Sequence, residues 1–261
     1  MKKNKQTKVM CLDIGNTNIY GGVFSDETLQ LQFRYPSSYV FTSDQLGVFF
    51  KQVLQENQQN PKDIQAVSIA SVVPSLNYSV RSAFIKYFDI EPQFIDAKIK
   101  TDLIIACDSP LEVGADRIAN AIAVLDLFPK KNIIIVDLGT ATTFEAISHK
   151  KEYLGGAIIP GIYTSMKALH ENTAQLPPVN ITQPSTVVGK NTVTNIQSGL
   201  YFSHLGAIRE ITKKIAEEVF HNKNVVILGT GGFSYLFTNE HVFSKTIPDL
   251  VLHGLRLITQ T

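Results

Sequence analysis

Short apolar runs recur at two places in the chain, and each ends at a turn. Residues 9–12 and residues 133–136 are each followed by an aspartate, a glycine and small polar side chains. Apolar runs of this length that are bounded by turn residues predict buried strands. Two β-rich stretches follow each run, and one more buried strand comes later in each half. These additional strands are predicted over residues 19–24, 29–35 and 66–71, and over residues 142–147, 153–159 and 225–228.

Helical periodicity occupies other segments of the chain. Residues 43–58 repeat apolar side chains at the spacing of one helix face. Residues 116–128 show the same pattern, which Pro129 stops because proline cannot continue a helix. Two more helices are predicted over residues 195–220 and 248–258.

The order of these elements is the same in the two halves of the chain. Each half is predicted as β-β-β-α-β-α, and no low-complexity linker separates them. Alternating strands and helices indicate α/β layers, and self-similarity over such a length indicates duplication of a fold. The sequence therefore predicts two similar, tightly packed α/β domains, residues 1–115 and residues 116–261.

Composition and charge narrow the classes of function. The 261 residues are 44% hydrophobic and carry 24 basic against 23 acidic side chains, a net charge of +1. A protein that binds nucleic acid through its phosphates needs a clear basic excess, so no nucleic-acid partner is expected. No uncharged apolar run reaches the roughly 20 residues that cross a bilayer, and no signal-peptide core is visible. We expect a cytoplasmic protein without a membrane partner.

The first candidate site is the turn after the first predicted strand. Asp13 stands at the end of that strand, and residues 15–18 are glycine and small polar residues. Gly15 is expected to permit a tight turn with positive φ, so that backbone N–H groups converge on a phosphate. Asp13 could then hold Mg²⁺ beside the phosphates. Alone, the motif is more typical of a β-hairpin whose asparagine and glycine serve only the turn.

The second candidate site repeats the first in the other half. Asp137, Gly139 and Thr140 follow the strand at residues 133–136 with the same aspartate-to-glycine spacing. Two phosphate-type loops that face each other across a cleft would suit an enzyme that binds a nucleotide. This repetition favours a functional interpretation over a turn that Asp137 merely caps.

The third candidate site precedes the predicted helix at residues 116–128. Residues 109–112 read as a capping box with proline at the first helical position, and Gly114 then breaks that turn. Asp116 would open the next helix, whose positive end favours the carboxylate anion. A base at Asp116 and an anion clamp at Arg117 would suit a hydroxyl substrate bearing a carboxylate. An N-cap aspartate beside an exposed arginine explains the pattern equally well.

In their order and spacing these motifs resemble the type III pantothenate kinases of the acetate/sugar kinase, Hsc70 and actin superfamily. Further segments resemble the family at residues 155–161, 176–177, 189–192 and 229–232. The resemblance implies two ribonuclease H-like (actin-like ATPase) domains, each a mixed five-stranded sheet with helices, and a cleft between them. It also implies ATP-dependent phosphorylation of pantothenate to 4'-phosphopantothenate, the first step of coenzyme A biosynthesis.

The resemblance also assigns roles to residues. Asp116 would accept the proton of the substrate hydroxyl, and Asp137 would ligate a monovalent cation, K⁺ or NH₄⁺. ATP would bind with Mg²⁺, and Thr192 would reach pantothenate across the interface of a homodimer. The ATP contacts implied are Asp13, Ile14, Gly15, Asn16, Thr17, Asn18, Ile19, Tyr20 and Thr140, and the pantothenate contacts are Gly114, Ala115, Asp116, Arg117 and Thr192.

Two departures from the family pattern keep alternatives open. Cys107 stands where the family usually has tyrosine, and Glu145 stands where it usually has aspartate. The cysteine affects one wall of the implied pantothenate site, whereas the glutamate keeps the charge with a longer reach. One alternative is a non-catalytic member that acts as a transcriptional accessory factor. Another is a kinase of the superfamily with a different hydroxyl substrate.

Overall fold

The computed structural model describes residues 8–37 and 39–259, which form two compact units. The first unit comprises the chain up to Asp102, together with Asp108–Asp126 and the segment from Leu250. The second comprises Leu103–Cys107 and Leu127–Asp249. This division differs from the predicted boundary after residue 115, because two helices that follow that point pack with the first unit.

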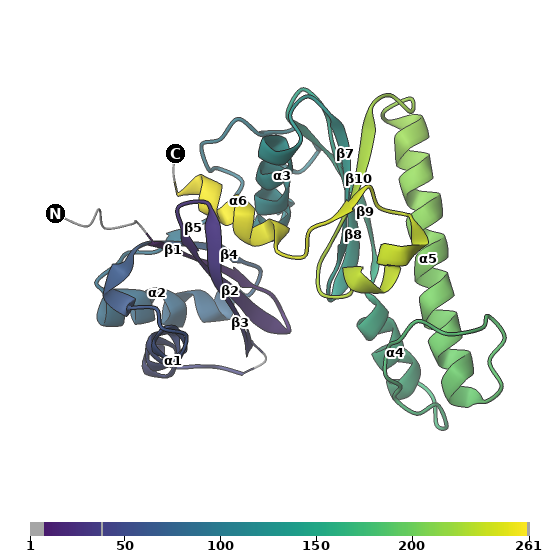
Figure 1. Ribbon diagram of the computed structural model, residues 1–261, viewed down its shortest axis with the longest axis horizontal. Coiled ribbons are helices and arrows are strands. Elements are labelled where there is room, and N and C mark those ends of the chain that lie inside the picture. Colours follow the sequence, from purple (N-terminus) through teal and green to yellow (C-terminus); the bar gives the residue numbers. More distant parts are fainter. Residues whose placement is uncertain (1–7, 38, 260–261) are drawn as a thin grey trace. The chain divides into compact units, whose positions relative to one another are not determined.

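A five-stranded mixed sheet forms the centre of the first unit, as predicted (Figure 1). Its strand order is β3-β2-β1-β4-β5, with β1 antiparallel to β2 and parallel to β4. Successive side chains of a strand point to opposite faces of the sheet, and β1 and β2 are buried on both faces. The strands are β1 (Lys8–Ile14), β2 (Asn18–Ser25), β3 (Thr28–Pro36), β4 (Ile64–Ser71) and β5 (Gln93–Phe94).

Helices α1 (Ser43–Glu56) and α2 (Pro74–Phe88) cover one face of this sheet. Thr42 and Gln45 form a capping box that starts α1, so the helix begins at the predicted residue. Phe50 of α1 and Phe84 of α2 are fully buried and stack with ring centroids 5.0 Å apart. The main apolar core of the first unit therefore lies between this face and the two helices. A short 3₁₀ turn, η1 (Pro61–Asp63), leads into β4.

The opposite face of the first sheet is covered by the C-terminal helix α6 (Leu250–Ile258). A Cβ at Gly22 of β2 would lie 2.7 Å from the Leu252 side chain. Gly254 approaches α3 (Ala115–Leu127) so closely that a Cβ there would collide with the backbone of Ala119. This close packing explains why α3 and α6 belong to the first unit.

The second unit contains a six-stranded mixed sheet, so the predicted count of five strands is wrong for this half. The additional strand, β6 (Ile104–Ile105), lies at the edge of the sheet. It pairs in parallel with the first residues of β9, which come more than 40 residues later in the chain. The strand order is β11-β10-β7-β8-β9-β6. The other strands are β7 (Asn132–Leu138), β8 (Ala141–Ile147), β9 (Glu152–Pro160), β10 (Val225–Thr230) and β11 (Lys245–Thr246).

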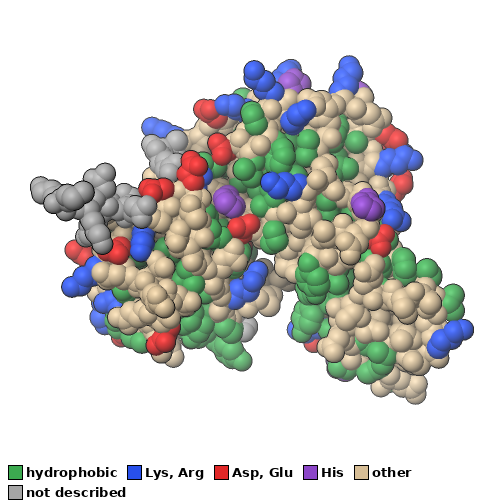
Figure 2. All heavy atoms as spheres, in the orientation of Figure 1, with side chains coloured by type: hydrophobic (Ala, Val, Ile, Leu, Met, Phe, Trp, Pro, Cys, Tyr) green, Lys and Arg blue, Asp and Glu red, His purple; other side chains and the backbone are tan. Residues whose placement is uncertain are grey.

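Helices α4 (Ile162–Glu171) and α5 (Thr192–Glu218) and the 3₁₀ segment η3 (Ser234–Glu240) contribute to the core of the second unit. Helix α5 begins three residues before its predicted start, because Asn191 and Thr194 form a capping box. None of the helices within residues 8–37 and 39–259 is long and apolar enough to span a bilayer. On the face shown in Figure 2, basic and acidic side chains are interspersed.

Candidate active site

The first acidic loop joins β1 to β2. The Gly15 N–H donates to the carbonyl of Asn18 at 3.0 Å, which closes the turn, and the polar residues 16–18 are exposed. Gly15 does not adopt the positive φ expected for it, so the turn needs no left-handed residue. The side chains of Ile14 and Ile19 are fully buried in the core, and only their backbone groups could contact a ligand.

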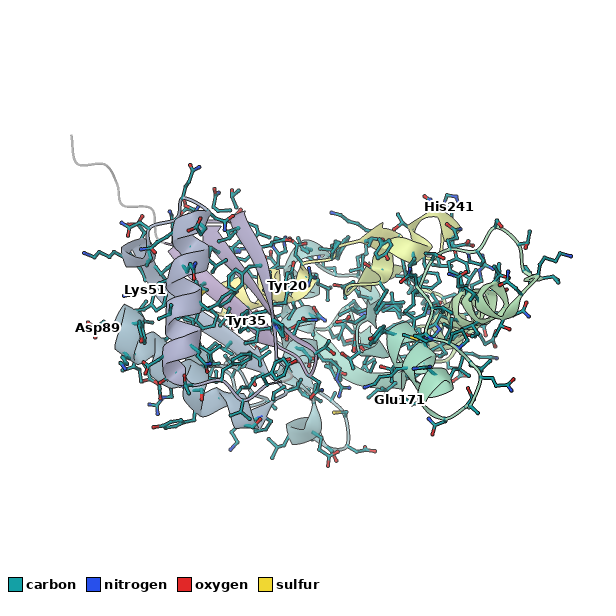
Figure 3. The ribbon with its side chains drawn as sticks, turned by 90° about the horizontal axis from the view of Figure 1, so that it is seen from below. Tyr20, Tyr35, Lys51, Asp89, Glu171 and His241 are labelled. Atoms are coloured by element: carbon teal, nitrogen blue, oxygen red, sulfur yellow. The ribbon has the colours of Figure 1, made fainter. Side chains whose placement is uncertain are left out.

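Asp13 and Tyr20 lie opposite each other in the pairing of β1 with β2. Their side chains therefore share one face of the sheet, the face that α6 covers, while Tyr35 packs on Phe49 of α1 at the opposite face (Figure 3). Tyr20 is largely buried, and the Arg34 guanidinium lies 4.2 Å from its ring centroid. Sequence reasoning missed Arg34, because only the register of β3 on β2 brings this cation next to Tyr20.

The third candidate site forms the N-terminus of α3. Asp116 Oδ1 accepts the backbone N–H of Arg117 at 2.8 Å, and the Ile118 N–H donates to Gly114 as the first helical bond. A Cβ at Gly114 would collide with that Asp116 oxygen, so a larger residue there would push the carboxylate out of this position. The Ala115 side chain is buried and faces the core.

The turn before this helix differs in one respect from the prediction. A 3₁₀ turn, η2 (Pro110–Glu112), begins at the proline as expected. However, Ser109 makes no capping hydrogen bond with its side chain, so the predicted capping box is wrong. A single 3₁₀ turn has few unpaired N–H groups to satisfy, which explains why a cap is not required.

The second acidic loop joins β7 to β8 in the second unit. The Gly139 N–H donates to the Ala141 carbonyl at 3.0 Å, and Thr140 is exposed at the tip of the turn. The Thr140 carbonyl accepts two bonds from the start of α4: Gly161 N–H at 3.1 Å and Thr164 Oγ1 at 2.6 Å. Helix α4 therefore fixes the loop, with one face of Thr140 left to solvent.

Gly231, which follows β10, lies against Asp137 and was not identified as a site residue from the sequence. Its φ is +83°, and a Cβ there would collide with the Asp137 carboxylate and lie 2.7 Å from the Leu138 nitrogen. Thr143 pairs directly with Asp137 across β7 and β8. The Thr143 hydroxyl is buried and makes no hydrogen bond within residues 8–37 and 39–259. Asp137 thus lies beside the backbone of Gly231 and on the same face of the sheet as the buried Thr143 hydroxyl.

Thr192 is the first residue of α5 and lines an apolar groove between α4 and α5. The groove has a volume of about 1060 Å³ and is also lined by Pro160, Leu169, Ile196 and Leu200. The Thr192 side chain is exposed. Each acidic loop is thus seated in its own unit, with Asp13 and Asp116 in the first unit and Asp137, Thr140 and Thr192 in the second.

The two departures from the family pattern lie in the second unit. Glu145 is almost completely buried on β8, and the strand register places it on the same face as Asp137. Cys107 is a free, partly exposed thiol just after β6. The other cysteine, Cys11, is buried in β1 of the first unit, and burial raises the pKa of its thiol well above the ordinary value.

Comparisons with known proteins identify relatives over most of the chain. A family model described as type III pantothenate kinase matches residues 9–214. A type III pantothenate kinase from Legionella pneumophila (strain Corby) is 52% identical over 95% of this chain and 97% of its own length. Type III pantothenate kinase 1 from Francisella tularensis subsp. holarctica (strain OSU18) is 47% identical over 97% of this chain and 98% of its own length.

Solved structures show the same fold at low sequence identity. A Baf family protein from Campylobacter jejuni superposes with a TM-score of 0.58 at 18% identity, covering 96% of this chain and 97% of its own. The apo psk41 ParM protein superposes with a TM-score of 0.50 at 13% identity, covering 98% of each chain. The fold, with its two mixed sheets, is that of the actin-like ATPases, as predicted. From the family match and the extent of these identities, the chain belongs to the type III pantothenate kinases, which catalyse the ATP-dependent first step of coenzyme A biosynthesis.

Proposed function

We propose that the chain transfers the γ-phosphoryl group of ATP to the primary hydroxyl of pantothenate, with Asp116 as the proton acceptor. The observation that carries this role is the seating of the Asp116 carboxylate. Its Oδ1 is held by the Arg117 amide, while Oδ2 makes no hydrogen bond within residues 8–37 and 39–259. One oxygen therefore fixes the group and the other is available to a substrate hydroxyl. Arg117 would bind the pantothenate carboxylate.

Each acidic loop offers groups that would bind phosphate oxygens of ATP. Residues 16–18 and Thr140 are exposed, and backbone N–H groups of such turns can donate to phosphate oxygens. Asp13, on the strand that leads into the first loop, supplies a carboxylate to hold Mg²⁺, which neutralises charge on the phosphates when bound. Phosphoryl transfer depends mainly on positioning and charge stabilisation, so few catalytic side chains are needed.

The residues around Asp137 fit a monovalent cation. K⁺ binds to carboxylate, hydroxyl and carbonyl oxygens, which the Asp137 carboxylate, the Thr143 hydroxyl and nearby backbone can supply. No group of three or more histidine, cysteine or acidic side chains suited to a metal occurs in the described part of the chain. A site made mostly of uncharged oxygens agrees better with K⁺ or NH₄⁺ than with a tightly held divalent ion.

An assay of ADP release tests this function. With Mg·ATP, pantothenate is expected to start ADP release and K⁺ or NH₄⁺ to increase it severalfold, whereas Na⁺ alone supports little. Release without pantothenate, or with another alcohol in its place, would favour a different kinase of the superfamily. No ATP turnover under any condition would favour a non-catalytic role in transcription.

We further propose that the groove between α4 and α5 binds a second copy of the chain. Its lining is predominantly apolar, and apolar side chains are also exposed at Tyr163 of α4, Val193 of α5 and Val188 of the loop before α5. A matching face on the partner would cover this surface and bring Thr192 to the partner's pantothenate. The dimer proposal rests on these contacts and on the family resemblance. A cytoplasmic location is proposed on the same resemblance.

A charge placed in the groove tests the dimer. Leu169→Glu puts a carboxylate on its apolar lining and is expected to convert the chain from a dimer to a 28.9 kDa monomer in sedimentation. Because Thr192 would then be missing from the partner's site, the KM for pantothenate should rise at least tenfold. Val48→Glu, a similar change at an exposed position on α1 in the first unit, should change neither the mass found by sedimentation nor the KM for pantothenate. An active monomeric Leu169→Glu variant would contradict the proposal.

A further inference from the structure

Ser37, which directly follows β3, makes two hydrogen bonds to the first acidic loop. Its hydroxyl donates to the Gly15 carbonyl at 2.5 Å, and its backbone N–H donates to the Thr17 carbonyl at 3.1 Å. The side chain is almost completely buried, with 6% of its surface exposed. One residue therefore holds two carbonyl groups of a turn that lies 20 residues earlier in the chain.

These bonds determine where the N–H groups of the loop point. In a planar trans peptide the carbonyl of one residue and the N–H of the next point in opposite directions. Holding the Gly15 carbonyl toward Ser37 therefore directs the Asn16 N–H away from it. That N–H has no hydrogen-bond partner among residues 8–37 and 39–259, and Asn16 is exposed. The hydroxyl of Ser37 thus holds this donor in an orientation that faces away from Ser37.

Within residues 8–37 and 39–259, no other hydrogen bond fixes the same peptide. The bond from Gly15 N–H to the Asn18 carbonyl closes the turn, but it acts on the peptides before and after the one between Gly15 and Asn16. Without the Ser37 hydroxyl, the part-buried Gly15 carbonyl would lose its side-chain partner and this peptide could rotate. Loss of one hydrogen bond to a buried group is a substantial effect because its desolvation is then uncompensated.

We propose that Ser37 is a positioning residue for ATP, which orients the Asn16 N–H toward a phosphate oxygen. This inference rests on the proposed role of residues 15–18 in phosphate binding. Ser37 itself touches no phosphate in this arrangement and acts through the loop. A purely structural role for the hydroxyl would lower the stability of the fold without a selective effect on ATP.

The test compares Ser37→Ala with Ser37→Thr in the full-length chain. Ser37→Ala is expected to raise the KM for ATP about five- to tenfold, with the KM for pantothenate unchanged. It should also reduce the increase in Tm that Mg·AMP-PNP produces. Ser37→Thr retains the hydroxyl and should restore both values. Ser25→Ala is the matched control, because Ser25 is equally buried at the far end of β2 and its hydroxyl has no partner among the described residues.

Asp13→Asn separates this inference from the ATP-binding proposal on which it rests. If Asp13→Asn weakens ATP binding and Ser37→Ala does not, the loop still binds ATP and the role of Ser37 is refuted. If neither variant alters ATP binding, the loop itself is not the phosphate site. Equal increases in both KM values for Ser37→Ala, not restored by threonine, would show a structural role only and overturn the inference.

Discussion

Replacing Asp116 with asparagine is expected to lower kcat by about 10²–10⁴-fold, the usual contribution of a general base. Asparagine keeps an oxygen that can accept the Arg117 N–H, so the N-terminus of α3 should stay intact. The second carboxylate oxygen is replaced by an NH₂ group, which cannot take a proton from the substrate hydroxyl. The decisive readout is kcat measured with both substrates saturating, together with the affinity for Mg·AMP-PNP, which should not change.

The control for this change lies on the same helix. Asp126 is an exposed aspartate near the C-terminal end of α3, and Asp126→Asn should leave kcat unaltered. The Tm of Asp116→Asn should lie within about 3 °C of the native value, because less than about 1 kcal/mol of stability is at stake. Near-native turnover by Asp116→Asn would remove this residue from the chemistry.

Replacing Gly231 with alanine is expected to cause the largest combined loss of stability and activity. The alanine would have to adopt a φ of +83° and place its Cβ against the Asp137 carboxylate and the Leu138 backbone. A left-handed conformation costs about 1–2 kcal/mol and overpacking about 1–3 kcal/mol. The Tm should therefore fall by about 5–15 °C, and displacement of Asp137 should weaken the response to K⁺.

The adjacent glycine provides the matched control for Gly231→Ala. A Cβ at Gly232 would meet no atom within 4 Å, and its φ is not positive. Gly232→Ala should therefore keep the native Tm and the native K⁺ activation in a thermal melt and an ADP-release assay. A Gly231→Ala variant that behaves like Gly232→Ala would show that Asp137 is not held by this contact.

The predictions that succeeded depend on local pattern. Strands β1 and β7 are apolar runs bounded by turn residues, and α1 has both periodicity and a capping signal, so short-range physics determines them. The positions of Asp13 and Asp137 near the ends of these strands follow from the same local pattern. The duplication of the strand-turn pattern, rather than either copy alone, indicated a nucleotide-binding fold.

The features that sequence analysis missed depend on contacts between distant segments. Strand β6 has only two residues and no periodicity, so nothing local indicates that it pairs with β9. The packing of Gly254 against α3 joins the end of the chain to its middle, which a division into consecutive halves cannot express. Ser37 and Gly231 act on loops 20 or more residues away. Ser37 follows a proline, and Gly231 belongs to a glycine pair after a strand; both patterns are common in turns. Only the pairing of distant strands brings these residues next to the acidic loops.

Following the phosphoryl group itself tests the central claim most directly. Phosphorus NMR of the chain with Mg·ATP, K⁺ and pantothenate should show the γ-phosphate signal replaced, one for one, by a phosphomonoester on the pantothenate hydroxyl. The Asp116→Asn variant should bind both substrates and yield almost none of this signal. Inorganic phosphate as the only product, or equal ester formation by the variant, would contradict the account.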